Sequence, residues 1–295
     1  MLKIIFIFLF TFNTVISFAQ INENKSRILY GTVFKNSLTI PPFDSWFNTG
    51  YESYKPKPET ILQLKKLNLK NYTVQIFLGT WCGDSKREVP RFMRLANEIG
   101  FPIGNIQLIA VGDPDSLYKQ SPQHEEKGLG IFRVPAFIIY KNGVELNRIN
   151  EFPVSSLEND LLNIIITPQA YVPNHRFSSL VTKWLNEGSL LDENISSRSI
   201  AAQLKWLVNN ENELNSLGYL LIKQDRKKEA LKILQANYNL YPESANIISS
   251  LGEAYLKNDD AKNAITYLER ALEQNKDSRT VKSILNLLYE AKSIK

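Results

Sequence analysis

Residues 72–85 read YTVQIFLGTWCGDS, and this stretch contains the only cysteine of the chain, Cys82. Residues 72–78 are a compact apolar run, which is typical of a buried β-strand. Residues 85–98 predict a helix that follows the strand after a short turn. We therefore expect Cys82 to lie at a strand-to-helix junction, near the free backbone N–H groups at the start of that helix, where the thiolate form is favoured.

The sequence on both sides of this junction continues to alternate between strands and helices. Residues 27–34 show the alternation of a strand, and residues 58–67 carry the apolar side of a helix. This order indicates a mixed α/β sheet with helices on its faces. The aromatic-rich residues 43–54 are expected to form a long connection. Downstream we expect strands at 106–111 and 136–140, a turn at Lys141-Asn142-Gly143 into a strand at 144–149, and a helix at 156–166.

The character of the sequence changes after Thr167, where prolines interrupt it and no strand is expected to follow. Amphipathic helices are expected at 177–186 and 197–208. From Glu211 onward the sequence repeats itself with a period of about 34 residues. The glycines of the repeat allow two antiparallel helices to approach closely, and the alanines offer a small packing surface. Leu217-Gly218 recurs as Leu251-Gly252, Ala230 as Ala264, and Leu234 as Leu268.

This pattern resembles the tetratricopeptide repeat, with a first copy that ends at Pro242 and a second copy that has Lys276 in place of the closing proline. Two copies alone bury little surface. Residues 280–292 and the helices between 177 and 208 are therefore expected to cap them. The resemblance implies an all-α helical repeat region that binds a protein partner.

The α/β part resembles the thioredoxin superfamily over about residues 60–166. Three anchors in matching order support the resemblance: Trp81-Cys82-Gly83-Asp84-Ser85, Pro90 in the following helix, and residues 130–135, which read GIFRVP. The Lys141-Asn142-Gly143 turn follows the third anchor, as it does in the family. The resemblance implies a thioredoxin-like fold with Cys82 as its active-site thiol.

The resemblance also assigns residues that bind a substrate. Pro135 is the family's cis-proline and lies beside Cys82 in space, although the two are far apart in sequence. Val134 offers its backbone to an extended client peptide, which adds to it like a strand. Trp81 covers the active-site surface, and simple core packing is the alternative role for this side chain.

Two positions depart from the family pattern. Ser85 stands where the family has its second cysteine, and Ile76 stands where thioredoxin has a buried acid. A dithiol cycle is therefore impossible, and a mixed disulfide at Cys82 would wait for an outside thiol. We expect Ser85 to donate a hydrogen bond to the sulfur, whereas Asp84 opposes the thiolate and the two cations after Ser85 partly compensate.

Two functions remain open at this point. The first is a monothiol thiol–disulfide exchange or isomerase-type protein, with Cys82 as the nucleophile and clients bound through mixed disulfides. The second is a redox-inactive binding or scaffold protein of the cell envelope. The sequence leaves open whether the chain is an enzyme.

Other classes are disfavoured by composition. The formal net charge is +5 without a long basic run interleaved with aromatic residues, so no nucleic-acid partner is expected. A single cysteine cannot form a disulfide within the chain. His124 and His175 do not stand in metal-ligand spacing with Cys82 and are expected to be surface or hydrogen-bonded histidines. No metal and no cofactor are expected.

Residues 1–19 predict a signal peptide, because Lys3 precedes an apolar run and Ser17-Phe18-Ala19 supplies small residues for cleavage after Ala19. The run is short for a membrane span. We therefore expect an exported protein, periplasmic or secreted, without an integral membrane span after cleavage. The expected division is an N-terminal extension at 20–57, a thioredoxin-like domain at 58–167, a linker with capping helices at 168–210, and the repeats with their C-terminal cap at 211–295.

Overall fold

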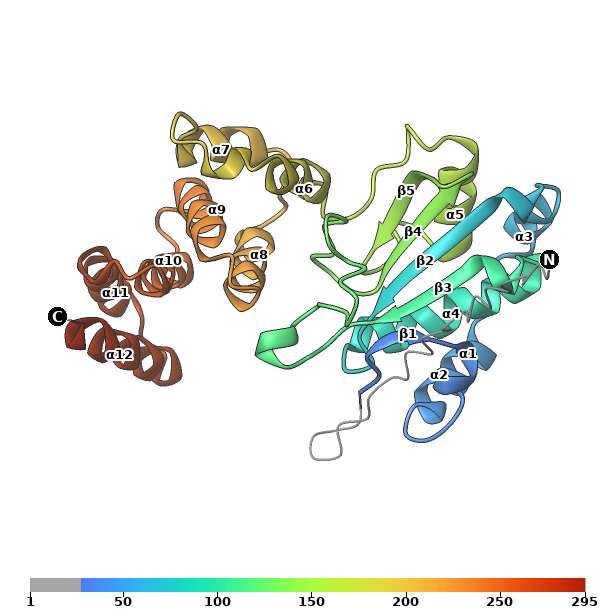
Figure 1. Ribbon diagram of the computed structural model, residues 1–295, viewed down its shortest axis with the longest axis horizontal. Helices are drawn as coiled ribbons and strands as arrows, with labels where there is room; N and C mark the ends of the chain where they lie inside the picture. Colours follow the sequence, from blue (N-terminus) through green and yellow to red (C-terminus); the bar gives the residue numbers. More distant parts are fainter. Residues whose placement is uncertain (1–27, 295) are drawn as a thin grey trace, which may run out of the picture.

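The computed structural model describes residues 28–294, so the expected signal peptide lies outside the described residues. Within them, an α/β part with a five-stranded sheet comes first and an all-α region follows (Figure 1). This confirms the coarse fold class, an α/β domain followed by helices. The strands are β1 (Gly31–Val33), β2 (Tyr72–Leu78), β3 (Ile106–Ala110), β4 (Ala136–Lys141) and β5 (Val144–Asn150).

The sheet has the order β1-β3-β2-β4-β5. β2 runs parallel to β3 and antiparallel to β4, and Phe77 of β2 lies opposite Ala136 of β4. Because β4 is antiparallel to β2, the residues after β2 and the residues before β4 meet at the same edge of the sheet. This register places Cys82 and Pro135 at that edge.

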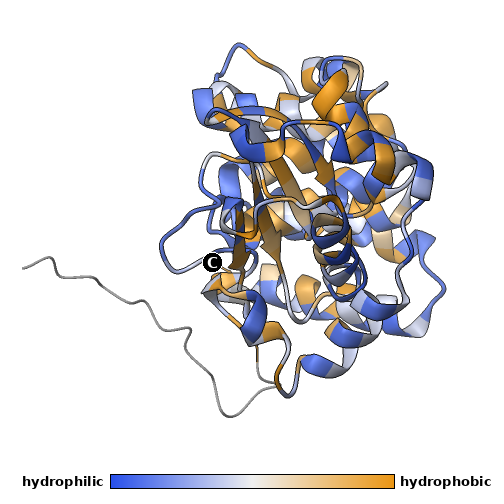
Figure 2. Ribbon diagram, turned by 90° about the vertical axis from the view of Figure 1, so that its right-hand side faces the viewer, coloured by the Kyte–Doolittle hydropathy of each residue, from blue (hydrophilic) through white to orange (hydrophobic). Residues whose placement is uncertain are grey.

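Alternate residues of the strands supply two hydrophobic layers, as the two-residue period of a strand requires. On β2, Ile76 belongs to the layer that packs against the helices, whereas Phe77 belongs to the opposite layer together with Val134. Hydrophobic residues accordingly concentrate on the strands (Figure 2). The helices of this part are α1 (Lys35–Leu38), α2 (Asp44–Ser53), α3 (Pro58–Lys65), α4 (Gly83–Ile99) and α5 (Leu157–Ile166).

The expected long connection at residues 43–54 is wrong, because most of it forms α2. Phe47 and Tyr51, one turn apart, stack with ring centroids 6.1 Å apart, and Phe47 is buried. α2 packs on α4, where a Cβ added to Gly50 would come within 2.6 Å of the Pro90 ring. The Asn-Thr-Gly sequence in the middle of α2 consists of weak helix formers, so the helix depends on this tertiary contact rather than on local propensity.

The all-α region is built from packed helix pairs. α8 packs on α9 and α10 packs on α11, and in each pair the glycine of the first helix faces a leucine of the second. The expected helices at both ends share hydrophobic cores with these pairs. None of the described helices is long and apolar enough to cross a membrane. The helices are α6 (Phe177–Glu187), α7 (Ser197–Leu204), α8 (Glu211–Lys223), α9 (Lys227–Leu240), α10 (Ala245–Lys257), α11 (Ala261–Gln274) and α12 (Ser278–Ser293).

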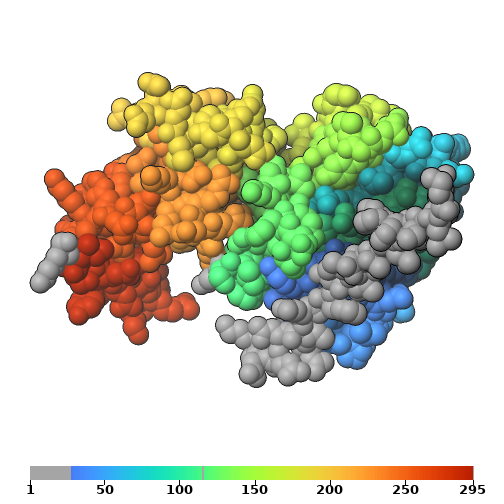
Figure 3. All heavy atoms as spheres, viewed as in Figure 1, coloured from blue at the N-terminus to red at the C-terminus, as the bar shows by residue number. Residues whose placement is uncertain are grey.

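The helical region extends from one end of the α/β part, and the two parts meet where the loop before β4 lies against α6 and α8 (Figures 1 and 3). Phe132 of this loop stacks on Phe177, with ring centroids 6.3 Å apart. Asn186 donates a hydrogen bond to the Gly128 carbonyl at 2.9 Å. The two parts are therefore in direct contact, close to the sheet edge that holds Cys82.

Gly218→Ala is expected to lower the free energy of unfolding by about 1–3 kcal/mol, because the added Cβ would lie 2.5 Å from the Cγ of the buried Leu234. At an open helix position the same change stabilises by about 0.5–1 kcal/mol, so the sign of the effect reports the close approach of α8 and α9. Urea unfolding followed by circular dichroism measures it. Gly104→Ala is the control, because its added Cβ has no neighbour within 4 Å. A neutral or stabilising Gly218→Ala would contradict this packing.

Candidate functional site

Cys82 is the N-cap residue of α4. Its backbone is extended, with φ −82° and ψ 128°, and its carbonyl accepts a helical hydrogen bond from Lys86 N–H at 3.0 Å. The thiol does not cap the helix, because Sγ donates to the Val134 carbonyl oxygen at 3.2 Å. The side chain is partly buried and free of any disulfide. The structure therefore places the thiol at the strand-to-helix junction that the sequence predicts.

Val134 and Pro135 face Cys82 from the start of β4. The Val134–Pro135 peptide bond is cis, as the resemblance implies. Both residues are buried, and Val134 retains only 2% of its surface exposed. The Pro135 carbonyl accepts a hydrogen bond from Glu151 N–H at 2.7 Å, which ties this segment to the end of β5. Cys82, Val134 and Pro135, three of the five predicted site residues, thus lie next to one another.

Trp81 lies on the sheet edge beside the cysteine. Its Nε1–H donates to the Val111 carbonyl at 3.1 Å, and its ring contacts Tyr118 with centroids 5.5 Å apart. A Cβ added to Gly79 would come within 2.6 Å of the indole, so only glycine leaves room for it. A cavity of about 670 Å³ lies beside this ring and is lined also by Trp46. Trp81 therefore packs against the core and borders the site at the same time.

Ser85 takes a different role from the expected one. Its side chain is fully buried, and Oγ accepts a hydrogen bond from Gly79 N–H at 3.1 Å. Among the described residues no hydrogen bond joins Ser85 to Cys82. The serine hydroxyl therefore satisfies a buried backbone group in the turn after β2 instead of donating to the sulfur.

Ile76, where the family pattern has an acid, is fully buried in the core.

Lys119 is a residue near the site that the sequence does not single out. Lys119 is 7% exposed, and its Nζ donates to the Phe132 carbonyl at 2.7 Å, two residues before the carbonyl that accepts from Cys82. Burial and the nearby Arg133 lower the pKa of Lys119 to about 8. A loop lysine normally indicates a solvated surface, so no local pattern could have predicted this position.

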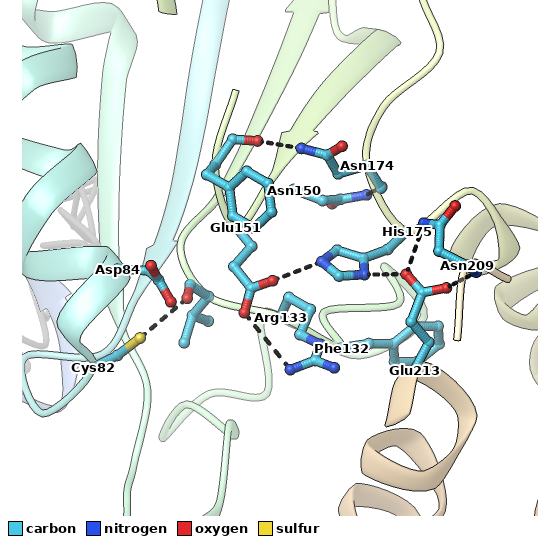
Figure 4. A network of polar contacts seen from close by, with 12 residues as sticks. Cys82, Asp84, Phe132, Arg133, Asn150, Glu151, Asn174, His175, Asn209 and Glu213 are labelled. Carbon is cyan, nitrogen blue, oxygen red and sulfur yellow. Dashed lines mark hydrogen bonds and ion pairs between the residues drawn. The ribbon is translucent and has the colours of Figure 1, made fainter. Parts of the chain in front are cut away.

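A buried polar cluster around His175 connects the site to the helical region (Figure 4). His175, in the linker, is 8% exposed. Its Nε2 lies 2.7 Å from Oε2 of Glu151, which follows β5, and its Nδ1 lies 2.8 Å from Oε1 of Glu213 in α8. Arg133 lies 3.6 Å from the other carboxylate oxygen of Glu151. The expectation of a hydrogen-bonded histidine is confirmed for His175, but its two partners come from two separate segments that no sequence spacing connects to it.

The pKa directions favour the charged forms of His175, Glu151 and Glu213. Burial lowers the pKa of His175, but its hydrogen bonds to Glu151 and Glu213 outweigh burial, so the pKa is raised above the usual 6.5. Burial raises the pKa of both carboxyl groups, but the hydrogen bond from His175 outweighs it, together with the charge of Arg133 at Glu151 and the hydrogen bonds from Asn209 at Glu213. Both pKa values end below the usual 4.5. The hydrogen bonds of the cluster therefore favour an imidazolium between two carboxylates.

Neither histidine is placed to act on the thiol. His124 is 61% exposed at its side chain and pairs with Glu126 at 3.3 Å. The two carboxylates around His175 bind opposite nitrogens of its ring, so the three groups do not converge on one point. Within residues 28–294, no cluster of three or more His, Cys, Asp or Glu side chains could hold a metal ion. No protein-family model, curated protein or solved structure matches this chain.

Ser85→Ala is expected to lower the free energy of unfolding by about 1–3 kcal/mol, because the buried N–H of Gly79 loses its acceptor. The rate at which 4,4′-dithiodipyridine reacts with Cys82 should remain that of the unmodified protein. Urea unfolding and a stopped-flow thiol assay measure the two effects. Ser179→Ala, at an exposed position of α6, is the control for both. A slower thiol reaction at unchanged stability would contradict the role of Ser85 described here.

Proposed function

We propose that this chain is an exported, thioredoxin-like protein with tetratricopeptide-type repeats that exchanges disulfides through the single thiol of Cys82. The observation on which the proposal depends is the position of that thiol. It is free and partly exposed, it lies at the N-cap of α4, and it faces the Val134–Pro135 segment. The clients are proteins or peptides that contain a disulfide. Export rests on the sequence of residues 1–19.

The surroundings of Cys82 set two opposing influences on the thiol. The free N–H groups and the dipole at the start of α4 favour negative charge on the sulfur. Asp84 would oppose this charge, but Arg87 pairs with it at 2.7 Å. The bond to the Val134 carbonyl stabilises the protonated thiol. When the sulfur loses its proton, this carbonyl becomes available as an acceptor for the backbone of a client peptide.

The exchange step involves only the sulfur atoms of the protein and its client. The thiolate of Cys82 attacks one sulfur of a client disulfide, so a bond forms between Cys82 and the client, the client's own S–S bond breaks, and its second sulfur leaves as a thiolate. The chain has no other cysteine to resolve the mixed disulfide. A client thiol or an external thiol must therefore attack it, and Cys82 leaves as the thiolate. Attack by a different client thiol rearranges the client disulfides without net oxidation or reduction.

The helical region supports the same function as a protein-binding element. Its packed helix pairs are flanked by helices that share their cores. It contacts the α/β part through Phe132, which lies in the loop leading to Val134 and Pro135. A client or partner held by these helices would be presented near Cys82.

The protein purified from its own cells without reductant is expected to carry mixed disulfides that dithiothreitol releases, because no second thiol in the chain resolves them. Gels run with and without reductant, followed by mass spectrometry of the released species, measure this. The species should be absent from Cys82→Ser and present in Ser179→Ala, which keeps the thiol. If the unmodified protein carries no such species and Cys82→Ser retains full biological function, thiol exchange is contradicted and the redox-inactive scaffold is favoured.

A further inference from the structure

We propose that His175 is a positioning residue that couples the helical region to the reactivity of Cys82, an inference that rests on the proposed function of this thiol. In its protonated form, the ring holds Glu151 of the α/β part and Glu213 of the helical region together across their contact. A partner that shifts α8 can thereby change the segment on which the thiol rests.

Polar contacts, joined by the backbone of residues 133–135, lead from the ring to the thiol. Figure 4 shows the contacts of His175 with its carboxylates and, separately, the contact of Cys82. The carboxylate of Glu151 binds the ring at 2.7 Å and lies 3.6 Å from the Arg133 guanidinium. The backbone N–H of Glu151 donates to the Pro135 carbonyl at 2.7 Å. Arg133 and Pro135 flank Val134, whose carbonyl accepts the thiol of Cys82. A displacement of Glu151 therefore acts on Arg133 and Pro135, the residues on either side of Val134.

On the other side of the ring, the contact is anchored in the helical region. Glu213 is 5% exposed and belongs to the first turn of α8. Its Oε2 accepts a hydrogen bond from Asn209 N–H at 2.7 Å, while its Oε1 binds His175 at 2.8 Å. The carboxylate is thus fixed to the start of α8, and a movement of this helix is transmitted to the ring.

The two bonds of the ring require its proton. Only the imidazolium form has N–H donors on both nitrogens, whereas the neutral ring has one donor and one lone pair. After deprotonation, one of the two carboxylates would face that lone pair and lose its hydrogen bond. His175 therefore joins the two parts only in the charged state.

Other charged groups face the same cluster. Arg133 and Lys119 both favour the negative charge of Glu151, and Arg133 disfavours the positive charge of His175. Lys119 itself loses its proton near its lowered pKa of about 8. The charge of Glu151 raises this pKa, so the pH profile of each protein contains the titration of Lys119 as well as that of His175.

The direction of the pH dependence follows from the raised pKa of His175. Because the folded pKa lies above 6.5, the stabilisation is fully present below about pH 6.5 and is lost as the pH rises through the folded pKa. The carboxyl groups have lowered pKa values, so their part is present above about pH 4.5 and is lost as the pH falls through the folded values. The contact of His175 with the two carboxylates is therefore strongest between about pH 4.5 and about pH 6.5.

The test compares the unmodified protein with His175→Gln at about pH 6 and about pH 9. Without the contact of His175 with Glu151 and Glu213, the hydrogen bond from the thiol of Cys82 to the Val134 carbonyl should weaken. The reaction with 4,4′-dithiodipyridine should therefore be about two- to tenfold faster in the variant at the lower pH. The ratio of the two rates should fall as the pH rises through the folded pKa of His175. Cleavage of the linker at residues 168–174 by a protease, measured in a Cys82→Ser background, should follow the same pattern.

His124→Gln is the matched control, since it removes the other histidine of the chain from an exposed position and should leave both readouts unchanged. Circular dichroism reports whether each variant is folded. If His175→Gln does not fold, Glu213→Leu replaces it, because the leucine side chain offers no acceptor to the His175 ring.

Parallel pH profiles of the unmodified protein and the variant in both assays would overturn the proposal. A change in linker cleavage without a change in thiol reactivity would overturn the connection to Cys82. Failure of the proposed function is a separate result: the unmodified protein would form no mixed disulfide with a disulfide-containing peptide, while linker cleavage would still depend on His175.

Discussion

The hydrogen bond from Cys82 to the Val134 carbonyl joins two segments that lie far apart in the sequence, and the candidate site depends on it. The bond exists because β4 runs antiparallel to β2, which puts the residues after one strand next to the residues before the other. Its donor, Cys82, lies at the start of α4, and its acceptor, Val134, is joined to Pro135 by a cis peptide bond. The thiol therefore lies where the start of α4 and the segment before β4 meet.

The same edge of the sheet is where the helical region makes contact. Phe132 stacks on Phe177, and His175 lies between carboxylates of the two parts. Buried charges are stable only when they are paired, so this cluster constrains how the two parts lie against each other. The thiol, the loop that faces it and the first repeat helix therefore form one connected region.

Much of the fold could be predicted from local patterns. The compact apolar run of β2, the Lys141-Asn142-Gly143 turn and the repeat glycines each depend on short-range chemistry. The position of Cys82 followed from the strand before it and the helix after it. The α2 helix could not be predicted, because its local sequence is a poor helix former and its stability comes from packing on α4. The hydrogen bond of the Ser85 side chain to the turn after β2 could not be predicted either, because it depends on how that turn folds. The partners of His175 could not be predicted because they lie in distant segments.

We propose that Cys82 is an exchanging thiol without a resolving partner, and intact-mass spectrometry of the protein treated with oxidised glutathione is the decisive experiment. We expect a single glutathione adduct on the folded protein that persists after the excess disulfide is removed and disappears when a reduced thiol is added. The adduct should be located on the peptide that contains Cys82. A folded protein that acquires no adduct, under conditions in which the urea-unfolded chain does, would contradict the account.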